Sequence, residues 1–251
     1  MIRIRTITAL ATVTALVATT ACSDDSVGPD DQIDVTADIA LIAADATDED
    51  LGLMGGMVPS GPGGGFGGFG DRTVTRSRTF LDADGTEMEA YDPLLTATIL
   101  TEMETRGDVT RGDLSLSIER TRTMTVSGLE GEETERTFDG LGTDARTRVV
   151  TSDARGERSF EMSGSLVVDG VVRAVDRESR PWPLSGTITR TMDVTILNGP
   201  NGDETRSSVV TVTFDGTQFA TMTVDGEIFE VDLANRGRDR MRRHRGGQGG
   251  P

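Results

Sequence analysis

The chain contains one cysteine, one histidine and no lysine among its 251 residues. A single cysteine excludes a disulfide framework and any zinc site built from several thiolates. A single histidine excludes a histidine-based metal cluster and argues against catalysis by a Ser/His or Cys/His pair. The composition therefore predicts a protein without a metal or cofactor, and not an enzyme.

Aromatic residues are also scarce, at 4 % of the chain. Paired carboxylates can hydrolyse glycosides, but such sites usually carry aromatic platforms for the sugar rings, so a carboxylate-based hydrolase is an alternative that the composition disfavours. The 25 basic residues are outnumbered by 42 acidic ones, which gives a formal net charge of −17. This acidity argues against nucleic acid as a partner.

The N-terminal apolar stretch, residues 6–21, is uncharged but shorter than the roughly 20 apolar residues that a spanning helix needs. Arg3 and Arg5 precede it, and Cys22 follows it directly. A basic start, a short apolar run and a small-residue end are typical of a secretory signal peptide. The sequence therefore predicts an exported protein.

The end of this segment resembles the signal peptide of bacterial lipoproteins, in which the cysteine after the cleavage site receives the lipid. Ala21 and Thr20 fit the small residues of that pattern, whereas Thr19 departs from the usual Leu. The resemblance covers residues 1–22 and implies lipidation of Cys22 and anchoring in the bacterial cell envelope, at the outer membrane. The alternative is an ordinary signal peptide in which Cys22 is incidental.

Residues 23–70 contain no basic residue, and acidic residues crowd their first half. Like charges keep such a chain extended, and residues 55–70 have the composition of a Gly-rich flexible linker, so we predict a tether. One short helix over residues 36–46 is allowed, either docked on the domain or nascent within the tether. Its apolar residues recur at helical spacing: Val35, Ile39, Ile42 and Ala46.

Residues 71–234 change to a period of two, with apolar residues alternating with Thr, Ser, Arg and Glu. We predict an all-β domain, an antiparallel meander of about ten to twelve strands that forms a sandwich or a barrel-like sheet. No domain family is recognised in it. Turn signals are expected at Asp84-Gly85, Gly107-Asp108, Asp139-Gly140, Asp169-Gly170, Asn198-Gly199, Asp215-Gly216 and Asp225-Gly226.

Parts of this region echo each other at an offset of 70 to 76 residues. Leu114-Ser115-x-x-Ile118-x-Arg120-Thr121 returns as Leu184-Ser185-x-x-Ile188-x-Arg190-Thr191, and Thr137-Phe138-Asp139-Gly140 returns as Thr213-Phe214-Asp215-Gly216. The order is kept, which favours an internal duplication over chance matching in a chain rich in Thr, Gly and Asp.

Several arginines share strand parity with apolar residues, which predicts that they point to the same face of the sheet. Such a row could receive the anionic head group of a small amphiphile, so a carrier of such ligands is an alternative function. The competing interpretations are that the arginines cover the rim and pair with Glu102, Glu104 or Glu119, or that a bulge reverses the parity. The candidate ligand-binding residues are Arg76, Arg78, Arg120, Arg122 and Arg190.

Residues 235–251 form an Arg/Gly-rich tail that we predict to be disordered. Its arginines suit an anionic surface, either lipid or polysaccharide, or they fold back on the acidic tether of the same chain. The candidate contacts are Arg236, Arg238, Arg240, Arg242, Arg243 and Arg245. The whole sequence therefore predicts a lipid-anchored cell-envelope protein whose β-domain is a non-catalytic binding or structural module, with no indication of its protein partners.

Overall fold

The computed structural model describes residues 35–57, 71–111, 114–152, 156–199, 202–235 and 240–243, all within one compact unit. It contains one long helix, α1 (Val35–Gly55), followed by eleven strands. The strands are β1 (Asp71–Leu81), β2 (Glu87–Met88), β3 (Thr98–Arg111), β4 (Leu114–Ser127), β5 (Glu135–Ser152), β6 (Gly156–Ala174), β7 (Ser185–Gly199), β8 (Gly202–Thr213), β9 (Phe219–Val224), β10 (Glu227–Asp232) and β11 (Met241–Arg243).

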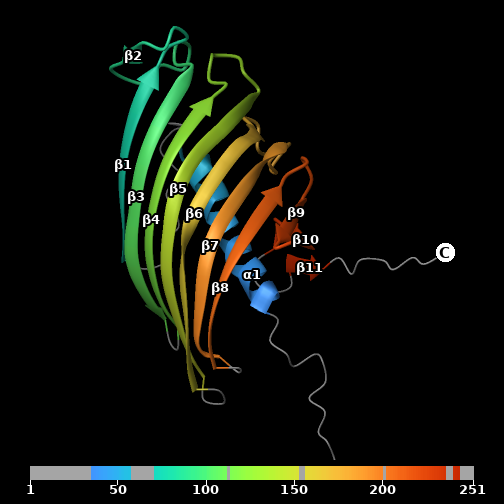
Figure 1. Ribbon diagram of the computed structural model, residues 1–251. Coiled ribbons are helices and arrows are strands. Elements are labelled where there is room, and N and C mark those ends of the chain that lie inside the picture. Colours follow the sequence, from blue (N-terminus) through green and yellow to red (C-terminus); the bar gives the residue numbers. More distant parts are fainter. Residues whose placement is uncertain are drawn as a thin grey trace, which may run out of the picture. The chain divides into compact units, whose positions relative to one another are not determined.

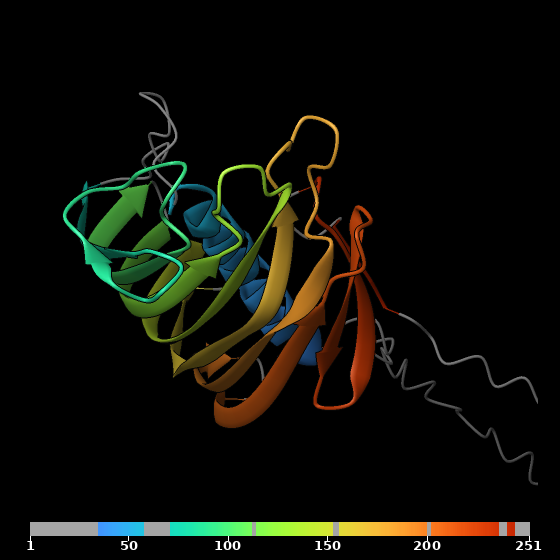
Figure 2. The same ribbon diagram turned by 90° about the horizontal axis from the view of Figure 1, so that it is seen from above.

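All eleven strands belong to one antiparallel sheet, in the order β11-β10-β9-β8-β7-β6-β5-β4-β3-β1-β2 (Figure 1). The predicted all-β antiparallel meander and its strand number are therefore confirmed. The sheet curls strongly but stays open, with β11 and β2 at its two ends. The element packed in its concave side is not a second sheet but α1 (Figure 2).

Helix α1 is longer than the sequence periodicity suggests, since it runs to Gly55 instead of ending near residue 46. Part of the predicted tether is thus built into the described fold. Small residues allow the helix to approach the sheet closely, because Ala40, Ala43 and Ala44 are fully buried and add little bulk. The added turns carry the acidic residues 48–50.

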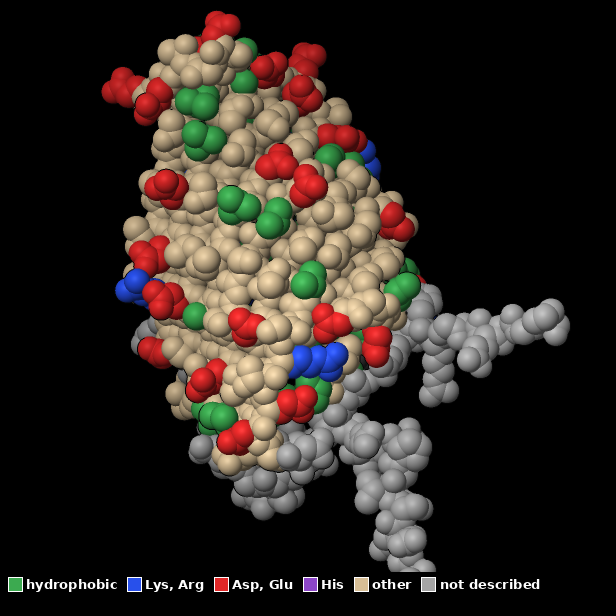
Figure 3. Space-filling model, viewed as in Figure 1, with side chains coloured by type: hydrophobic (Ala, Val, Ile, Leu, Met, Phe, Trp, Pro, Cys, Tyr) green, Lys and Arg blue, Asp and Glu red, His purple; other side chains and the backbone are tan. Residues whose placement is uncertain are grey.

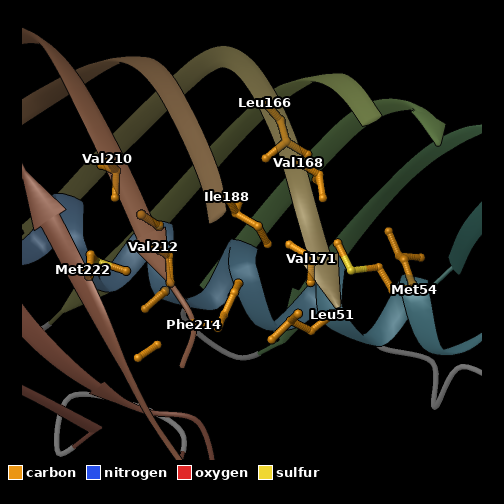
Figure 4. Packing of buried hydrophobic residues seen from close by; sticks show 14 of the residues in the cluster. Leu51, Met54, Leu166, Val168, Val171, Ile188, Val210, Val212, Phe214 and Met222 are labelled. Carbon is orange, nitrogen blue, oxygen red and sulfur yellow. The ribbon is translucent and has the colours of Figure 1, made fainter. Parts of the chain in front are cut away.

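The core lies between the inner face of the sheet and α1. Leu51 and Met54 of the helix pack with inward side chains of the strands (Figure 4). Burial alternates strictly along β4 from Ile118 to Met124, as the period of two predicts. The labelled strand and loop residues of this cluster are Leu166, Val168, Val171, Ile188, Val210, Val212, Phe214 and Met222.

Three of the seven predicted turn signals lie between strands, at residues 84–85, 215–216 and 225–226, and a fourth, Asn198-Gly199, ends β7. Asp225 and Gly226 both have positive φ, at 49° and 93°, as a two-residue hairpin of the primed type requires. The prediction is wrong for Gly107-Asp108, which lies inside β3, and for the signals at 139–140 and 169–170, which lie inside β5 and β6.

The two misassigned Asp-Gly pairs are β-bulges instead of turns. The register between β5 and β6 shifts between Phe138 and Gly140, and that between β6 and β7 shifts after Asp169. The two irregularities meet, because the Gly170 N–H donates to Oδ1 of Asp139 over 2.8 Å. Bulges increase local bending, so these residues help the long strands curl around α1.

Candidate functional site

Three arginines of the predicted row converge on the concave side of the sheet. We call this side the trough, and α1 fills it. Arg120 and Arg122 lie on β4 and Arg190 lies on β7, and each is at most 4 % exposed. The alternation predicted to turn them inward is therefore confirmed. Gly142 of β5 is the Cα partner of Arg122, and its missing side chain leaves room for the Arg122 guanidinium.

The partners of these guanidiniums are two buried carboxylates of the same chain. Asp144 of β5 accepts hydrogen bonds from Arg120 Nε at 2.7 Å, Arg122 Nη2 at 2.9 Å and Arg190 Nη1 at 2.7 Å. Asp50 of α1 accepts one from Arg122 Nε at 2.9 Å and another from Arg190 Nη2. We call Arg120, Arg122, Arg190, Asp50 and Asp144 the buried ion cluster.

A third carboxylate extends the cluster toward solvent. Glu49 accepts hydrogen bonds from Arg120 Nη2 at 2.8 Å and from Arg146 Nη2 at 2.6 Å, and its side chain is 31 % exposed. Four guanidiniums thus face three carboxylates, of which two come from the helix. The acidic run that suggested a solvated tether is the part of α1 that neutralises the sheet.

The electrostatics keep Asp50 and Asp144 ionised at neutral pH. Burial raises the pKa of Asp50, but the charges of Arg190, Arg120 and Arg122 outweigh it and hold that pKa below its ordinary value. Burial likewise opposes ionisation of Asp144, and the same arginines hold its pKa far below its ordinary value. A carboxylate so strongly ionised and surrounded by donors is poorly suited to exchange protons near neutrality. The arrangement is that of a structural ion cluster.

The other two predicted ligand-binding arginines do not join this cluster. Arg76 Nη1 and Arg78 Nη2 of β1 donate to the carbonyl oxygen of Gly56, at 3.0 and 2.8 Å. This carbonyl follows the last turn of α1, where the helix dipole is negative and cations are favourable. No basic residue lies in that last turn itself, so the sheet supplies the cations.

The predicted rim partners are wrong for the buried arginines. Glu104 and Glu119 pair instead with the exposed Arg106, at 2.7 and 2.9 Å. The sequence alone also missed the true partners, Asp50 and Asp144. One signal was available for Asp144, because it shares strand parity with the buried Phe138. No comparable local signal points to Asp50, which lies 72 residues from Arg122.

Part of the predicted basic tail folds back on the acidic segment, one of the two alternatives that the sequence left open. Arg240 is 1 % exposed, and its Nη1 donates to Asp48 at 2.7 Å and to Asp45 at 3.2 Å. Its Nη2 donates to the carbonyl of Ala44 at 2.9 Å. Residues 240–243 are therefore ordered, contrary to the predicted disorder, and β11 pairs with β10.

Two further predicted tail contacts, Arg242 and Arg243, lie on β11. Arg242 is exposed on β11, and Arg243 is the Cα partner of Phe229. Cys22 and three further tail residues, Arg236, Arg238 and Arg245, lie outside the described residues. Their predicted roles in lipidation and in contact with an anionic surface stay predictions.

The echoed sequence positions have matching environments. Arg120 and Arg190 both donate to Asp144, and Ile118 and Ile188 are both buried on the inner face. Phe138 and Phe214 are also both buried. The repeated pattern thus supplies equivalent parts of one trough.

Within the described residues, no set of three or more His, Cys, Asp or Glu side chains is arranged to hold a metal ion. The one described helix is not apolar enough over its length to cross a membrane. Comparison with protein-family models, with curated proteins and with solved structures gave no match for this chain.

Proposed function

We propose that the chain is an exported, lipid-anchored protein of the bacterial cell envelope, located at the outer membrane, and that its β-domain is a non-catalytic binding or structural module. The observation that supports a module of this kind is the filled trough. Helix α1 covers the apolar inner face, and its carboxylates bind the arginines that a ligand head group would otherwise meet.

The outer face of the sheet is then the large surface that the module offers to its surroundings. Side-chain hydroxyls of neighbouring strands contact each other there, as in Thr121–Thr143 at 2.8 Å and Thr195–Thr205 at 3.0 Å. Figure 3 shows acidic side chains scattered over this face, while basic ones are few. Leu141 and Val167, which are Cα partners, add an exposed apolar pair at its centre.

The anchor is supported by the arrangement of residues 1–22 alone, so it needs a direct test. The full chain would be produced in a bacterium with two membranes and labelled with an alkyne analogue of palmitate. We expect label in the outer-membrane fraction for the natural chain and for the neighbouring control Ser23→Ala, and none for Cys22→Ala. An unlabelled mature protein in the soluble periplasmic fraction would contradict the proposal.

The carrier alternative can be tested on the same preparation, because it predicts a bound lipid. A carrier would have to release α1 from the trough, and it would copurify with a stoichiometric lipid extractable only after denaturation. An extract free of such a lipid is expected for a domain whose trough is filled by its own helix. A lipid at one equivalent per chain would favour the carrier instead.

A further inference from the structure

Three more arginines meet at the carboxyl end of α1, apart from the buried ion cluster. Arg136 of β5 and Arg173 of β6 are direct Cα partners in the sheet, in register with the inward pair Phe138 and Val171. Arg177 follows β6, and its Nη1 lies 2.7 Å from the position that a Cβ atom would take at Gly55. Like charges directly opposite each other on neighbouring strands are destabilising.

Carboxylates do not compensate these charges within the part of the chain that the structure describes. The salt bridges there leave out all three guanidiniums, and the nearby Glu135 pairs with Arg180 at 2.8 Å. Arg173 donates instead to two carbonyls, Leu51 O at 2.7 Å and Pro181 O at 3.4 Å. The Nε atoms of Arg136 and Arg173 are buried without an acceptor.

The end of the helix is too weak a counter-charge for this group. A helix dipole is equivalent to about half a negative charge at its carboxyl end, and Gly56 already accepts hydrogen bonds from Arg76 and Arg78. Burial, together with the neighbouring charge of Arg177, lowers the pKa of Arg173 to about 10. Burial also lowers the pKa of Arg136, with Arg177 adding to this and Tyr91 opposing it.

We propose that Arg136, Arg173 and Arg177 form a binding site for a phosphate group. A carboxylate would cancel one of three positive charges, whereas a phosphate monoester brings close to two negative charges and three acceptor oxygens. Guanidinium forks match such oxygens in pairs. All three side chains are partly exposed, so a ligand can reach them from solvent, with Tyr91 beside Arg136 as a further neighbour.

The test is the thermal unfolding of the full chain in nonionic detergent, with inorganic phosphate compared with chloride at equal ionic strength. A ligand that binds the folded state alone raises the melting temperature in proportion to the logarithm of its concentration. We expect such a rise for the natural chain. We expect the apparent affinity to fall at least about tenfold in Arg136→Gln and in Arg173→Gln, since each loses charge-assisted hydrogen bonds.

The change in melting temperature that each substitution causes in the absence of phosphate separates a binding role from a purely structural one. Removing one of two opposed arginines relieves repulsion, so Arg136→Gln should melt no lower than the natural chain in chloride. Arg106→Gln, which removes an exposed arginine of the outer face, is the control and should keep the phosphate response. A natural chain without a phosphate-specific rise, or a double variant Arg136→Gln/Arg173→Gln that keeps it, would overturn the proposal.

Two sources of the phosphate group can be told apart in the same assay. An equal response to inorganic phosphate and to dihexanoyl phosphatidic acid would identify the phosphate group alone as the ligand, and a much tighter response to the latter would identify a lipid head group. Both outcomes support the site.

Discussion

Asp50 of α1 accepts a hydrogen bond from Nε of Arg122 over 2.9 Å, and both side chains are buried. This contact joins residues that are 72 positions apart. It ties a segment with the composition of a solvated tether to the centre of the sheet. The helix and the strands therefore complete each other, since each supplies charges that the other could not bury alone.

Asp50→Asn is expected to lower the free energy of unfolding by about 3–5 kcal/mol, because it leaves buried guanidiniums without their counter-charge. Urea unfolding followed by circular dichroism at pH 7 measures this. The matched control, Glu119→Gln, removes an exposed ion pair with Arg106 and should cost no more than about 1 kcal/mol. Equal losses in the two variants would show that the buried ion cluster does not hold the helix.

The stability should also depend on pH with a definite sign. The folded pKa of Asp50 is depressed, so its contribution is complete above its unfolded value, near pH 4, and disappears as the pH falls through the lower folded value. The difference in unfolding free energy between the natural chain and Asp50→Asn should therefore shrink below about pH 4. Urea titrations at intervals from pH 7 to pH 2 would measure it.

Asp45 lies on the same helix and serves as a control, because its contribution to stability should depend on pH with the opposite sign. Burial raises its pKa, although Arg240 opposes the shift. A raised carboxyl pKa disfavours the folded state at neutral pH, so the natural chain should gain relative to Asp45→Asn as the pH falls. A parallel trend for Asp45→Asn and Asp50→Asn would contradict the assigned directions.

The sequence could predict the orientation of the strand arginines because strand parity is a local property. Arg120 and Arg122 alternate in step with Ile118 and Met124, so the face that buries the apolar residues also receives the guanidiniums. The Asp-Gly signals were less informative, since the same dipeptide suits a hairpin and a bulge. What separates them at Asp139 is its contact with Gly170, 31 residues away.

The extent of α1 could not be read in the same way. Acidic residues 48–50 repel one another in isolation, and each of them pairs with an arginine far along the chain: Asp48 with Arg240, Glu49 with Arg146 and Asp50 with Arg122. The same holds for Arg240, whose basic surroundings suggest a solvated tail until Asp45 and Asp48 are placed beside it. The local composition therefore does not determine the structure of either segment, because that structure depends on contacts with oppositely charged residues far away in the sequence.

The contact of Arg240 with the helix should act as a clasp that holds β11 in place. Arg240→Ala removes hydrogen bonds to Asp45, Asp48 and Ala44 O, at an expected cost of about 1–3 kcal/mol. Hydrogen exchange should become faster in residues 241–243 and around residues 44–48. Arg242→Ala, an exposed change on the same strand, should leave the exchange of residues 44–48 unchanged, and equal acceleration in both variants would argue against a clasp.

Two glycines give the sharpest contrast in stability. At Gly142 an added Cβ would lie 2.5 Å from Thr121 O and 2.6 Å from Arg122 Nη1, so Gly142→Ala must displace backbone or move Arg122 away from Asp144. We expect a loss of about 1–3 kcal/mol or more. At Gly52, on the exposed side of α1, nothing lies within 4 Å of the added atom.

Gly52→Ala should therefore stabilise the protein by about 0.5–1 kcal/mol, because alanine restricts the unfolded chain and favours the helix. Urea unfolding of the two single variants and of the double variant measures both effects. Since the positions share no described contact, the two changes should add within about 0.5 kcal/mol. A neutral Gly142→Ala would mean that Arg122 can leave the buried ion cluster at no cost, and a destabilising Gly52→Ala would mean that α1 is not helical at that turn.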